Sequence, residues 1–330
     1  MEFRCGLIGL GRIGCGFDDN PNRKSINTHA GAYNSIKKTK LVALCDIDQI
    51  KLDKYGKKYN VSKLYTDFHE MLKNEELDCV SICTLADSHL EIVEQIAKSN
   101  VRAIFLEKPI SDTLENASKI VEICNKMKIK LQIDHQRRFD PFYHEIQKII
   151  QSNEFGKIQY VHIYYGGGIA NTGSHVFDLL RMFFGNVSWV EGNFSRNSSN
   201  NPNDPNIDGT IYFENDILCS IHAMSLINYG ILEFDILGER ERLRINLVNS
   251  TAEYFEISNS DVLLYKELKP KVHSFPEKSD SIVLGLENLL VSLENNEELL
   301  CTGKDGTSSL AVIIAMQNSA KDKGMRVFIN

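Results

Sequence analysis

Three glycines near the start of the sequence have a spacing that can hold a phosphate group. Gly9, Gly11 and Gly14 directly follow residues 3–8, an apolar run typical of a short buried strand. At this spacing the first glycine allows a tight turn, the second lets a pyrophosphate approach the backbone, and the third lets the next helix pack closely. The free N–H groups of that helix then face the phosphates. The motif predicts a dinucleotide site, with a plain glycine turn as the alternative.

An acid ends the second apolar run of the chain. Residues 41–45 lead into Asp46, and in a dinucleotide-binding unit an acid at this place accepts hydrogen bonds from the adenosine ribose. Asp48 follows closely and no arginine stands beside it, so a 2′-phosphate would meet carboxylates and no cation. We therefore expect NAD rather than NADP. The alternative is that Asp46 only caps the next helix.

Residues 15–27 interrupt the pattern expected after the glycines. They are polar and contain Gly, Pro and Asn, so they cannot form a clean amphipathic helix. We interpret them as an insertion beside the phosphate site, which explains why Asp46 lies further from the glycines than the usual ~20 residues. The insertion is expected to be either a solvated loop or a flap over cofactor or substrate.

The first part of the chain alternates apolar runs with helical patterns. Further strands are expected at 78–83, 103–106 and 130–133, and helices at 87–98 and 114–127. Near-continuous apolar strands alternating with helices indicate a parallel, doubly wound α/β sheet. Ligands of such sheets bind outside the carboxyl ends of the strands, which here carry Gly9, Asp46, Thr84, Lys108 and Asp134.

The second part has a different pattern of secondary structure, with many consecutive strands joined by short turns. After a helix at 141–151 we expect strands at 156–165, 187–195, 208–214, 217–226, 230–238, 241–247, 252–257, 261–266 and 325–329, and helices at 173–184, 279–294 and 306–323. Consecutive strands indicate a mainly antiparallel sheet in an α+β domain. The expected domains are 1–134 and 135–330, with the last helix and strand able to pack back on the first domain.

Two features of the second part bear on recognition. Residues 197–205 are rich in Asn, Ser and Pro and are typical of an exposed loop. The segments 15–27 and 197–207 are expected to shape the substrate pocket. The runs Ile211-Tyr212-Phe213 and Ile217-Leu218-Cys219 place apolar residues on both faces of the sheet. A sheet that is apolar on both faces needs cover, so we expect a homo-oligomer built through its exposed face.

Composition excludes several classes of protein. The 330 residues carry a net charge of −7 without a long basic run, which argues against nucleic acid and membrane surfaces as partners. No apolar run reaches transmembrane length, and the N-terminus lacks a signal-peptide pattern. The eight cysteines form no C-x-x-C pair, which favours buried thiols in a reduced cytoplasm. Cys and His do not cluster, so we expect no metal site.

Beyond these patterns, the chain resembles the glucose–fructose oxidoreductase, inositol dehydrogenase and MocA-like (Gfo/Idh/MocA) family over nearly its whole length. The resemblance is carried by the three glycines, Asp46, Glu107-Lys108-Pro109, Arg137-Arg138-Phe139-Asp140-Pro141, Gly173-Ser174-His175-x-x-Asp178 and the segment 301–306. It implies a Rossmann domain followed by an open-faced sheet domain, in dimers or tetramers. It also implies redox chemistry with a pyridine nucleotide at a hydroxyl-bearing carbon of a sugar, cyclitol or derivative.

This sequence departs from the family pattern at three places. The family usually has Asp four residues before the histidine, where this chain has Asn171. The insertion at 15–27 is the second departure. The third is Asp134-His135-Gln136, where many relatives carry Gly, an aromatic residue and Asn.

Lys108 and His175 are the expected catalytic residues. Hydride transfer from an alcohol carbon needs a general base within ~2.6–3.2 Å of the hydroxyl. Lys108 can be that base if burial or nearby cations lower its pKa, or its ammonium can polarise the carbonyl during reduction. His175 titrates near neutrality without a large shift. The alternatives are a solvated loop lysine and a satisfied core histidine.

Four further residues are expected to contact substrate: Asn171, Asp178, Asp134 and Arg138. Asn171 can orient a partner but cannot take a proton. Asp178 shares a helix face with His175 and is a substrate ligand, an orienting partner or a core acid. Asp134 could replace the missing carboxylate, or it could bind backbone or an arginine.

The expected cofactor-binding residues are Gly9, Gly11, Arg12, Ile13, Gly14, Asp46, Thr84, His89, Glu107 and Lys108. The favoured function is an NAD-dependent oxidoreductase acting on a secondary hydroxyl or keto carbon of a carbohydrate-like small molecule. One alternative is a lyase, epimerase or glycosidase-like enzyme that retains NAD and oxidises its substrate transiently. Another is a non-catalytic NAD-binding protein, against which Lys108 and His175 argue.

Overall fold

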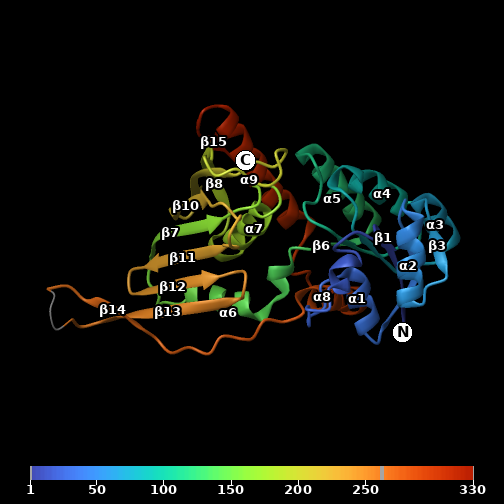
Figure 1. The fold of residues 1–330 in the computed structure, drawn as a ribbon, viewed down its shortest axis with the longest axis horizontal. Helices are drawn as coiled ribbons and strands as arrows, with labels where there is room; N and C mark the ends of the chain where they lie inside the picture. The colour runs from blue at the N-terminus through green and yellow to red at the C-terminus, as the bar shows by residue number, and fades with distance from the viewer. Residues whose placement is uncertain (1, 261–263, 330) are drawn as a thin grey trace. The chain divides into compact units, whose positions relative to one another are not determined.

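The computed structural model describes residues 2–260 and 264–329, and the chain divides into two compact units (Figure 1). Unit 1 contains Met1–Asp140 and Ser279–Leu310, and unit 2 contains Pro141–Lys278 and Ala311–Asn330. This division ends unit 1 at Asp140, whereas the expected boundary is residue 134, and it groups the segment 279–310 with the first unit. The segment joins unit 1 by close packing. A Cβ added at Gly285 would lie 2.6 Å from the Phe139 ring and 3.0 Å from the Phe105 ring.

Unit 1 is built on a six-stranded parallel sheet in the order β3-β2-β1-β4-β5-β6. The strands are β1 (Phe3–Ile8), β2 (Thr39–Cys45), β3 (Lys63–Tyr65), β4 (Cys79–Ile82), β5 (Ala103–Leu106) and β6 (Lys130–Ile133). The expected parallel α/β architecture is thus confirmed. The three-residue edge strand β3 was missed because it is short and not buried. The strand order reverses between β1 and β4, which is the place where open α/β sheets bind ligands.

The helices that the structure describes wholly within unit 1 are α1 (His29–Ser35), α2 (Gln49–Tyr59), α3 (Phe68–Asn74), α4 (His89–Ile96), α5 (Leu114–Met127) and α8 (Ser281–Asn295), with short 3-10 turns at Gly16–Asp19, Ala86–Ser88 and Gln136–Phe139. Four of these six helices, namely α1, α2, α3 and α5, have a side-chain N-cap. Asp48 caps α2, since its carboxylate accepts the N–H groups of Ile50 and Lys51. Asp46, by contrast, accepts a hydrogen bond from the glycine loop.

The insertion is looped out of the helix that follows the glycine motif. The N–H of His29 donates to the carbonyl of Ile13 (3.1 Å), and that of Ala30 donates to Gly14 (3.0 Å). In an uninterrupted helix these bonds would come from the residues four positions on, so about a dozen residues are looped out. This explains the long separation between the glycines and Asp46.

The looped-out segment is tied to the rest of unit 1. The Asp19 carboxylate accepts hydrogen bonds from Lys54 Nζ (2.7 Å), Tyr55 Oη (2.8 Å) and Lys58 Nζ (2.7 Å) of α2. Further along, the Ile26 N–H donates to Asp280 (3.1 Å). Because it is tied both to α2 and to the residue before α8, the insertion forms an ordered loop rather than a freely hinged flap.

Unit 2 is built on a nine-stranded sheet in the order β14-β13-β12-β11-β7-β10-β9-β8-β15. The strands are β7 (Ile158–Tyr165), β8 (Val187–Phe194), β9 (Ile207–Phe213), β10 (Leu218–Ala223), β11 (Glu233–Gly238), β12 (Glu241–Asn246), β13 (Thr251–Ser258), β14 (Glu267–Pro270) and β15 (Val327–Phe328). The sheet is mainly antiparallel, as expected, with β10 and β7 pairing in parallel. Half of the strand expected at 261–266 lies outside the described residues.

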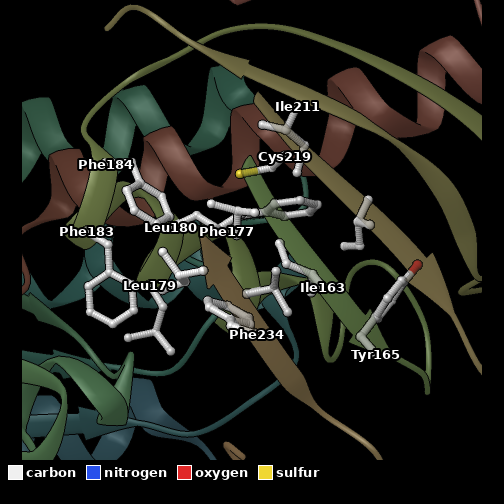
Figure 2. Packing of buried hydrophobic residues seen from close by; sticks show 14 of the residues in the cluster. Ile163, Tyr165, Phe177, Leu179, Leu180, Phe183, Phe184, Ile211, Cys219 and Phe234 are labelled. Atoms are coloured by element: carbon white, nitrogen blue, oxygen red, sulfur yellow. The ribbon is translucent and has the colours of Figure 1, made fainter. Parts of the chain in front are cut away.

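One face of this sheet packs against α7 (Gly173–Phe184) to form the core of unit 2 (Figure 2). Phe177, Leu180 and Phe184 of α7 pack near Ile211 and Cys219 of the strands. The helices α6 (Pro141–Ile150) and α9 (Gly303–Lys321) complete the described helices.

The opposite face of the sheet is less apolar than the sequence indicates. Arg242 binds Asp235 with its Nε at 2.8 Å, and Arg244 Nη1 lies 3.0 Å from Glu253. Aromatic rings also occur: Phe255 lies 6.0 Å from the Arg242 guanidinium, and further along the sheet Tyr212 of β9 stacks on Trp189 of β8 at 5.0 Å. The expectation of two apolar faces is therefore wrong for this face, which combines ion pairs with aromatic rings.

The cysteines and helices bear on the remaining expectations. All eight cysteines are buried and free of disulfides. Among the described residues, no helix has both the length and the apolar character that crossing a membrane requires.

Candidate functional site

The three glycines of the motif have different surroundings. Gly9 has φ = +92°, and an added Cβ would lie 2.7 Å from the Cys83 backbone. At Gly14 a Cβ would lie 2.1 Å from the Gly9 carbonyl oxygen, so the helix can approach the strand only without a side chain. At Gly11 a Cβ would meet nothing within 4 Å. The open space at Gly11 is where a pyrophosphate could approach the backbone.

Asp46 ties the glycine loop to the end of β2. Its Oδ2 accepts the N–H of Leu10 (2.7 Å), and its Oδ1 accepts the N–H of Asp48 (2.9 Å). Lys51 Nζ lies 3.5 Å from Asp46 Oδ1 and 3.8 Å from Asp48 Oδ2. The expectation that no cation stands here is therefore wrong. The first turn of α2 folds Lys51 back toward Asp46, which a search for a neighbouring arginine could not detect.

The ends of β4 and β5 are joined by a buried histidine. His89 Nδ1 lies 3.1 Å from the Ile110 carbonyl, and its Nε2 lies 3.3 Å from the Thr84 carbonyl. Burial lowers the pKa of His89, although these backbone carbonyls oppose the shift. Thr84 is half-buried and accepts a hydrogen bond from Ser88 (2.7 Å). His89 thus fixes the loop that carries Thr84.

Two further expected cofactor residues, Arg12 and Ile13, lie between the glycines. Arg12 is exposed, and its guanidinium lies 4.7 Å from the centre of the Phe17 ring. Arg23 of the insertion lies over the same ring at 4.5 Å. Ile13 packs against the small apolar cluster under the glycine loop. The insertion therefore places a second guanidinium near the glycine motif.

Lys108 follows β5 directly and is half-buried. Its backbone N–H donates to the Oε2 of Glu107 (3.3 Å). The Glu107 side chain itself is only 10% exposed and points into unit 1. Glu107 was expected to contact cofactor, but the structure gives its carboxylate a partner in the interior.

That partner is His29, which the sequence analysis did not single out. His29 Nε2 lies 3.0 Å from Glu107 Oε1 and 3.3 Å from Asp134 Oδ2, and Nδ1 lies 2.9 Å from Ser81 Oγ. One ring nitrogen of His29 and one carboxylate oxygen each of Glu107 and Asp134 lie within 4.8 Å of one another. When both carboxyl groups are ionised they only accept hydrogen bonds, so Nε2 then carries a proton. We describe these three residues as a hydrogen-bonded cluster, the His29 cluster.

Burial and charge act in opposite directions within the His29 cluster. Burial lowers the pKa of His29, but Cys83, Asp134 and Glu107 together raise it well above its ordinary value. Burial raises the pKa of Glu107 to about 7, with Asp134 adding to the shift and His29 opposing it. The two buried carboxyl groups therefore favour the charged form of the imidazole, which burial opposes.

Two of the expected substrate ligands lie within unit 1. Asp134 is 1% exposed and faces His29, where the sequence analysis considered a backbone or arginine partner. Arg138 is 9% exposed, and its Nη1 lies 3.3 Å from Asp305 Oδ1. Both side chains thus have partners in their own unit, and their contact with substrate stays a prediction.

In unit 2, a glycine turn leads into α7 and is held by a loop that the sequence indicated to be exposed. Asp204 and Asn206 are 7% and 3% exposed. The Asp204 carboxylate accepts the N–H groups of Ala170 (2.8 Å) and Asn171 (2.9 Å). The expectation of an exposed loop at 197–205 is therefore wrong at the end of that segment. There the buried Asp204 carboxylate accepts hydrogen bonds from backbone N–H groups of the turn.

Asn171, His175 and Asp178 lie along the turn and the first part of α7. Asn171 is exposed, His175 is half-buried, and Asp178 is 1% exposed. His175 and Asp178 are three positions apart on the helix and so share a face. Sequence reasoning missed Asp204, since nothing in its Asn-rich surroundings distinguishes it from a surface loop acid.

Comparison with known proteins covers both units. The model of the Gfo/Idh/MocA oxidoreductases described as "Oxidoreductase family, NAD-binding Rossmann fold" matches residues 3–135. The model described as "Oxidoreductase family, C-terminal alpha/beta domain" matches residues 147–328.

Individual relatives match along the whole chain. D-apiose dehydrogenase of Paraburkholderia graminis is 25% identical over 94% of this chain and 87% of its own. Myo-inositol 2-dehydrogenase of Thermotoga maritima is 24% identical over 97% of each chain. The structure of the WlbA dehydrogenase from Bordetella pertussis, in complex with NADH and UDP-GlcNAcA, has a TM-score of 0.81 at 21% identity and covers 100% of this chain and 99% of its own.

The glycine environments predict opposite effects of two alanine substitutions. Gly14→Ala should lower the free energy of unfolding by about 1–3 kcal/mol, because the methyl group collides with the Gly9 carbonyl. Gly11→Ala should leave unfolding unchanged but weaken NAD binding by at least about tenfold, a loss of about 1.4 kcal/mol. Chemical unfolding and calorimetric titration of both variants measure this. Equal loss of stability in the two variants would contradict the assignment.

Proposed function

We propose, from the premise that this chain belongs to the Gfo/Idh/MocA family of NAD-binding oxidoreductases, that it is a dehydrogenase acting on a carbohydrate-like substrate. It would transfer a hydride between nicotinamide and a secondary hydroxyl or keto carbon of a sugar, cyclitol or sugar derivative. The relatives named for D-apiose and myo-inositol, and the solved structure holding a UDP-sugar, support this substrate class. Lys108 at the end of β5, in the same unit as the glycine loop, is the observation that carries the proposal.

NAD supplies the hydride acceptor or donor when bound, and the chain supplies the rest. Gly11 leaves room for the pyrophosphate, and Asp46 is positioned to accept hydrogen bonds from the ribose hydroxyls. Lys108 would remove the hydroxyl proton during oxidation or polarise the carbonyl during reduction. His175 would exchange the proton with substrate, since an imidazole titrates near neutrality.

Asn171, Asp178 and Arg138 would orient the substrate. Asn171 is exposed at the start of α7 and can bind a hydroxyl through its amide. The carboxylate that the family usually carries at this position is absent, and Asp204 does not replace it as a base, because both its oxygens already accept backbone N–H groups. Eight buried free thiols favour a reducing compartment, and we propose the cytoplasm.

We expect the oligomer to form through the second face of the sheet in unit 2, as a homodimer or homotetramer. Tyr164, 36% exposed on β7, stands among the ion pairs of that face. Light scattering at micromolar concentration should find more than one chain, and Tyr164→Glu should shift the protein toward the monomer. Tyr229→Glu, at an exposed loop tyrosine, is the matched control. A monomeric parent protein would count against this interface.

We expect NAD(H) to bind at least about tenfold more tightly than NADP(H), a difference of about 1.4 kcal/mol. Asp46 and Asp48 repel a 2′-phosphate, and Lys51 is largely neutralised by them. Asp46→Asn should narrow the preference and Lys51→Gln should widen it, whereas Lys54→Gln on the same helix should leave it unchanged. Fluorescence titration of both cofactors measures the ratio. Equal affinities in the parent protein would refute the assignment of Asp46.

Lys108→Ala and His175→Ala should each lower kcat roughly a hundred- to ten-thousand-fold, the usual worth of positioned proton transfer. NAD affinity should stay nearly unchanged in both. Asn171→Ala should lower kcat by a smaller factor, because an amide can orient the substrate but cannot relay a proton. Lys126→Ala, at an exposed helix lysine, is the control. Steady-state kinetics that follow NADH formation over a panel of sugars and cyclitols measure this.

Two outcomes would redirect the proposal. Near-normal turnover of Lys108→Ala would rule out the proposed proton transfer. Turnover of substrate without net release of NADH would favour the enzyme class that retains NAD and oxidises its substrate transiently.

A further inference from the structure

The His29 cluster is a buried group of titratable residues that has no role in the proposed mechanism. Its three members come from the first residue of α1, the end of β5 and the end of β6. His29 and Asp134 side chains are completely buried, and Glu107 keeps 10% of its side chain exposed. All three therefore lie inside unit 1, at the carboxyl edge of its sheet, and Glu107 gives the group an outlet toward solvent.

The charges of this cluster do not balance when every member is ionised. Two carboxylates face one imidazolium, which leaves one negative charge in the interior. Asp134 Oδ1 is buried without a hydrogen-bond partner among the described residues. An uncompensated buried charge is costly, so one added proton on the carboxyl pair makes the cluster neutral. The pKa of Glu107, raised to about 7 by burial and by Asp134, places this proton exchange near neutral pH.

Several thiols and one phenol are among the other titratable groups around the cluster. Cys83 faces His29 from the end of β4, and burial raises its pKa to about 11, so it is a neutral thiol. Beyond Ser81, Tyr33 Oη lies 2.8 Å from Ser81 Oγ and 3.4 Å from Cys79 Sγ. Burial raises the pKa of Tyr33 well above its ordinary value, while hydrogen bonds from Cys5 and Tyr33 lower that of Cys79.

Two more groups complete these surroundings. Cys15, which interacts with both His29 and Cys83, has its pKa raised by burial. Lys108 adjoins Glu107 in the chain, and its backbone N–H binds that carboxylate. The carboxyl pair is therefore the member of these surroundings whose proton exchange lies near neutrality. Hydrogen bonds lower the pKa of the Cys79 thiol, but Ser81 and Tyr33 separate that thiol from the imidazole.

The cluster lies at the edge where the proposed cofactor binds. Gly9 packs against the backbone of Cys83 and Thr84, and Cys83 in turn neighbours His29. The nicotinamide ring is positively charged in NAD⁺ and neutral in NADH. A negative charge on the cluster therefore strengthens the binding of NAD⁺ relative to NADH. Conversely, bound NAD⁺ favours the ionised form of the cluster.

We propose that the His29 cluster exchanges one proton in step with the charge of the bound cofactor. It is ionised beside NAD⁺ and protonated on its carboxyl pair beside NADH. When a hydride moves from substrate carbon to nicotinamide and the ring loses its charge, the cluster takes up one proton, which offsets the proton lost by the substrate hydroxyl. The inference rests on the proposed placement of the cofactor in unit 1.

The proton exchange can be measured without turnover. We would titrate NAD⁺ and NADH into the full chain by calorimetry at pH 6, 7 and 8, in buffers of different ionisation enthalpy. Binding of NAD⁺ should release a measurable fraction of a proton near pH 7, and NADH should release less or take one up. The ratio of the two dissociation constants, NAD⁺ over NADH, should fall roughly three- to tenfold from pH 6 to pH 8, since one unit of pKa shift is a tenfold effect.

Two glutamine substitutions separate this cluster from other sources of pH dependence. Glu107→Gln should still bind both cofactors but lose the proton release, because the amide keeps the shape and cannot titrate. Glu75→Gln is the matched control in the same unit, where Glu75 is 6% exposed and lies 3.5 Å from Lys63 Nζ and 3.8 Å from Arg4 Nη2. It should keep the full proton release. Unchanged release in Glu107→Gln would overturn the proposal and would point to Cys79.

Three further results bear on it directly. If Glu107→Gln does not fold, ¹³C NMR of labelled glutamate in the parent protein should show one carboxyl titrating near pH 7 that ionises at lower pH with NAD⁺ than with NADH; identical titrations would overturn the proposal. A proton release that changes with EDTA or added Zn²⁺ would also overturn it. Failure of both cofactors to bind would refute the proposed function, whereas binding without proton exchange refutes only this inference.

Discussion

The close approach of the first helix to the first strand of unit 1 determines where many of that unit's buried side chains lie. The carbonyl of Gly9 occupies the space that any side chain at residue 14 would need. The backbone of Cys83 closes off Gly9 in the same way. Because the helix begins so near the sheet, its continuation in α1 brings His29 under the ends of β4, β5 and β6. The glycines thus serve the interior of the unit as much as they serve a ligand.

A comparable constraint operates in unit 2 at the start of α7. Gly167 and Gly168 take positive φ values of 84° and 96°, and a Cβ at Gly168 would lie 2.0 Å from Asp204. The backbone of this turn finds its partners in Asp204 and Asn206, which come from a distant part of the chain. Asn171 and His175 therefore depend for their position on a loop that no local pattern connects to them.

Sequence reasoning succeeded where one periodicity dominated. The strands β5 and β6 and the helices α5 and α7 agree with expectation to the residue, because each is bounded by clear polar or glycine signals. It failed where a contact forms only once the chain has folded. Lys51 meets Asp46 only after α2 has formed, and His29 meets Glu107 only after the helix has resumed beyond the insertion. A lone histidine before Ala-Gly-Ala-Tyr gives no local sign that its partners are two acids at strand ends.

The looped-out segment has a consequence for how this chain can vary. Its two ends are joined by consecutive helical hydrogen bonds, His29 to Ile13 and Ala30 to Gly14, so they are neighbours in space. The free energy of closing such a loop grows only with the logarithm of its length. Evolution can therefore lengthen, shorten or replace the surface beside the glycine loop while the helix register, and every buried contact that depends on it, stays the same.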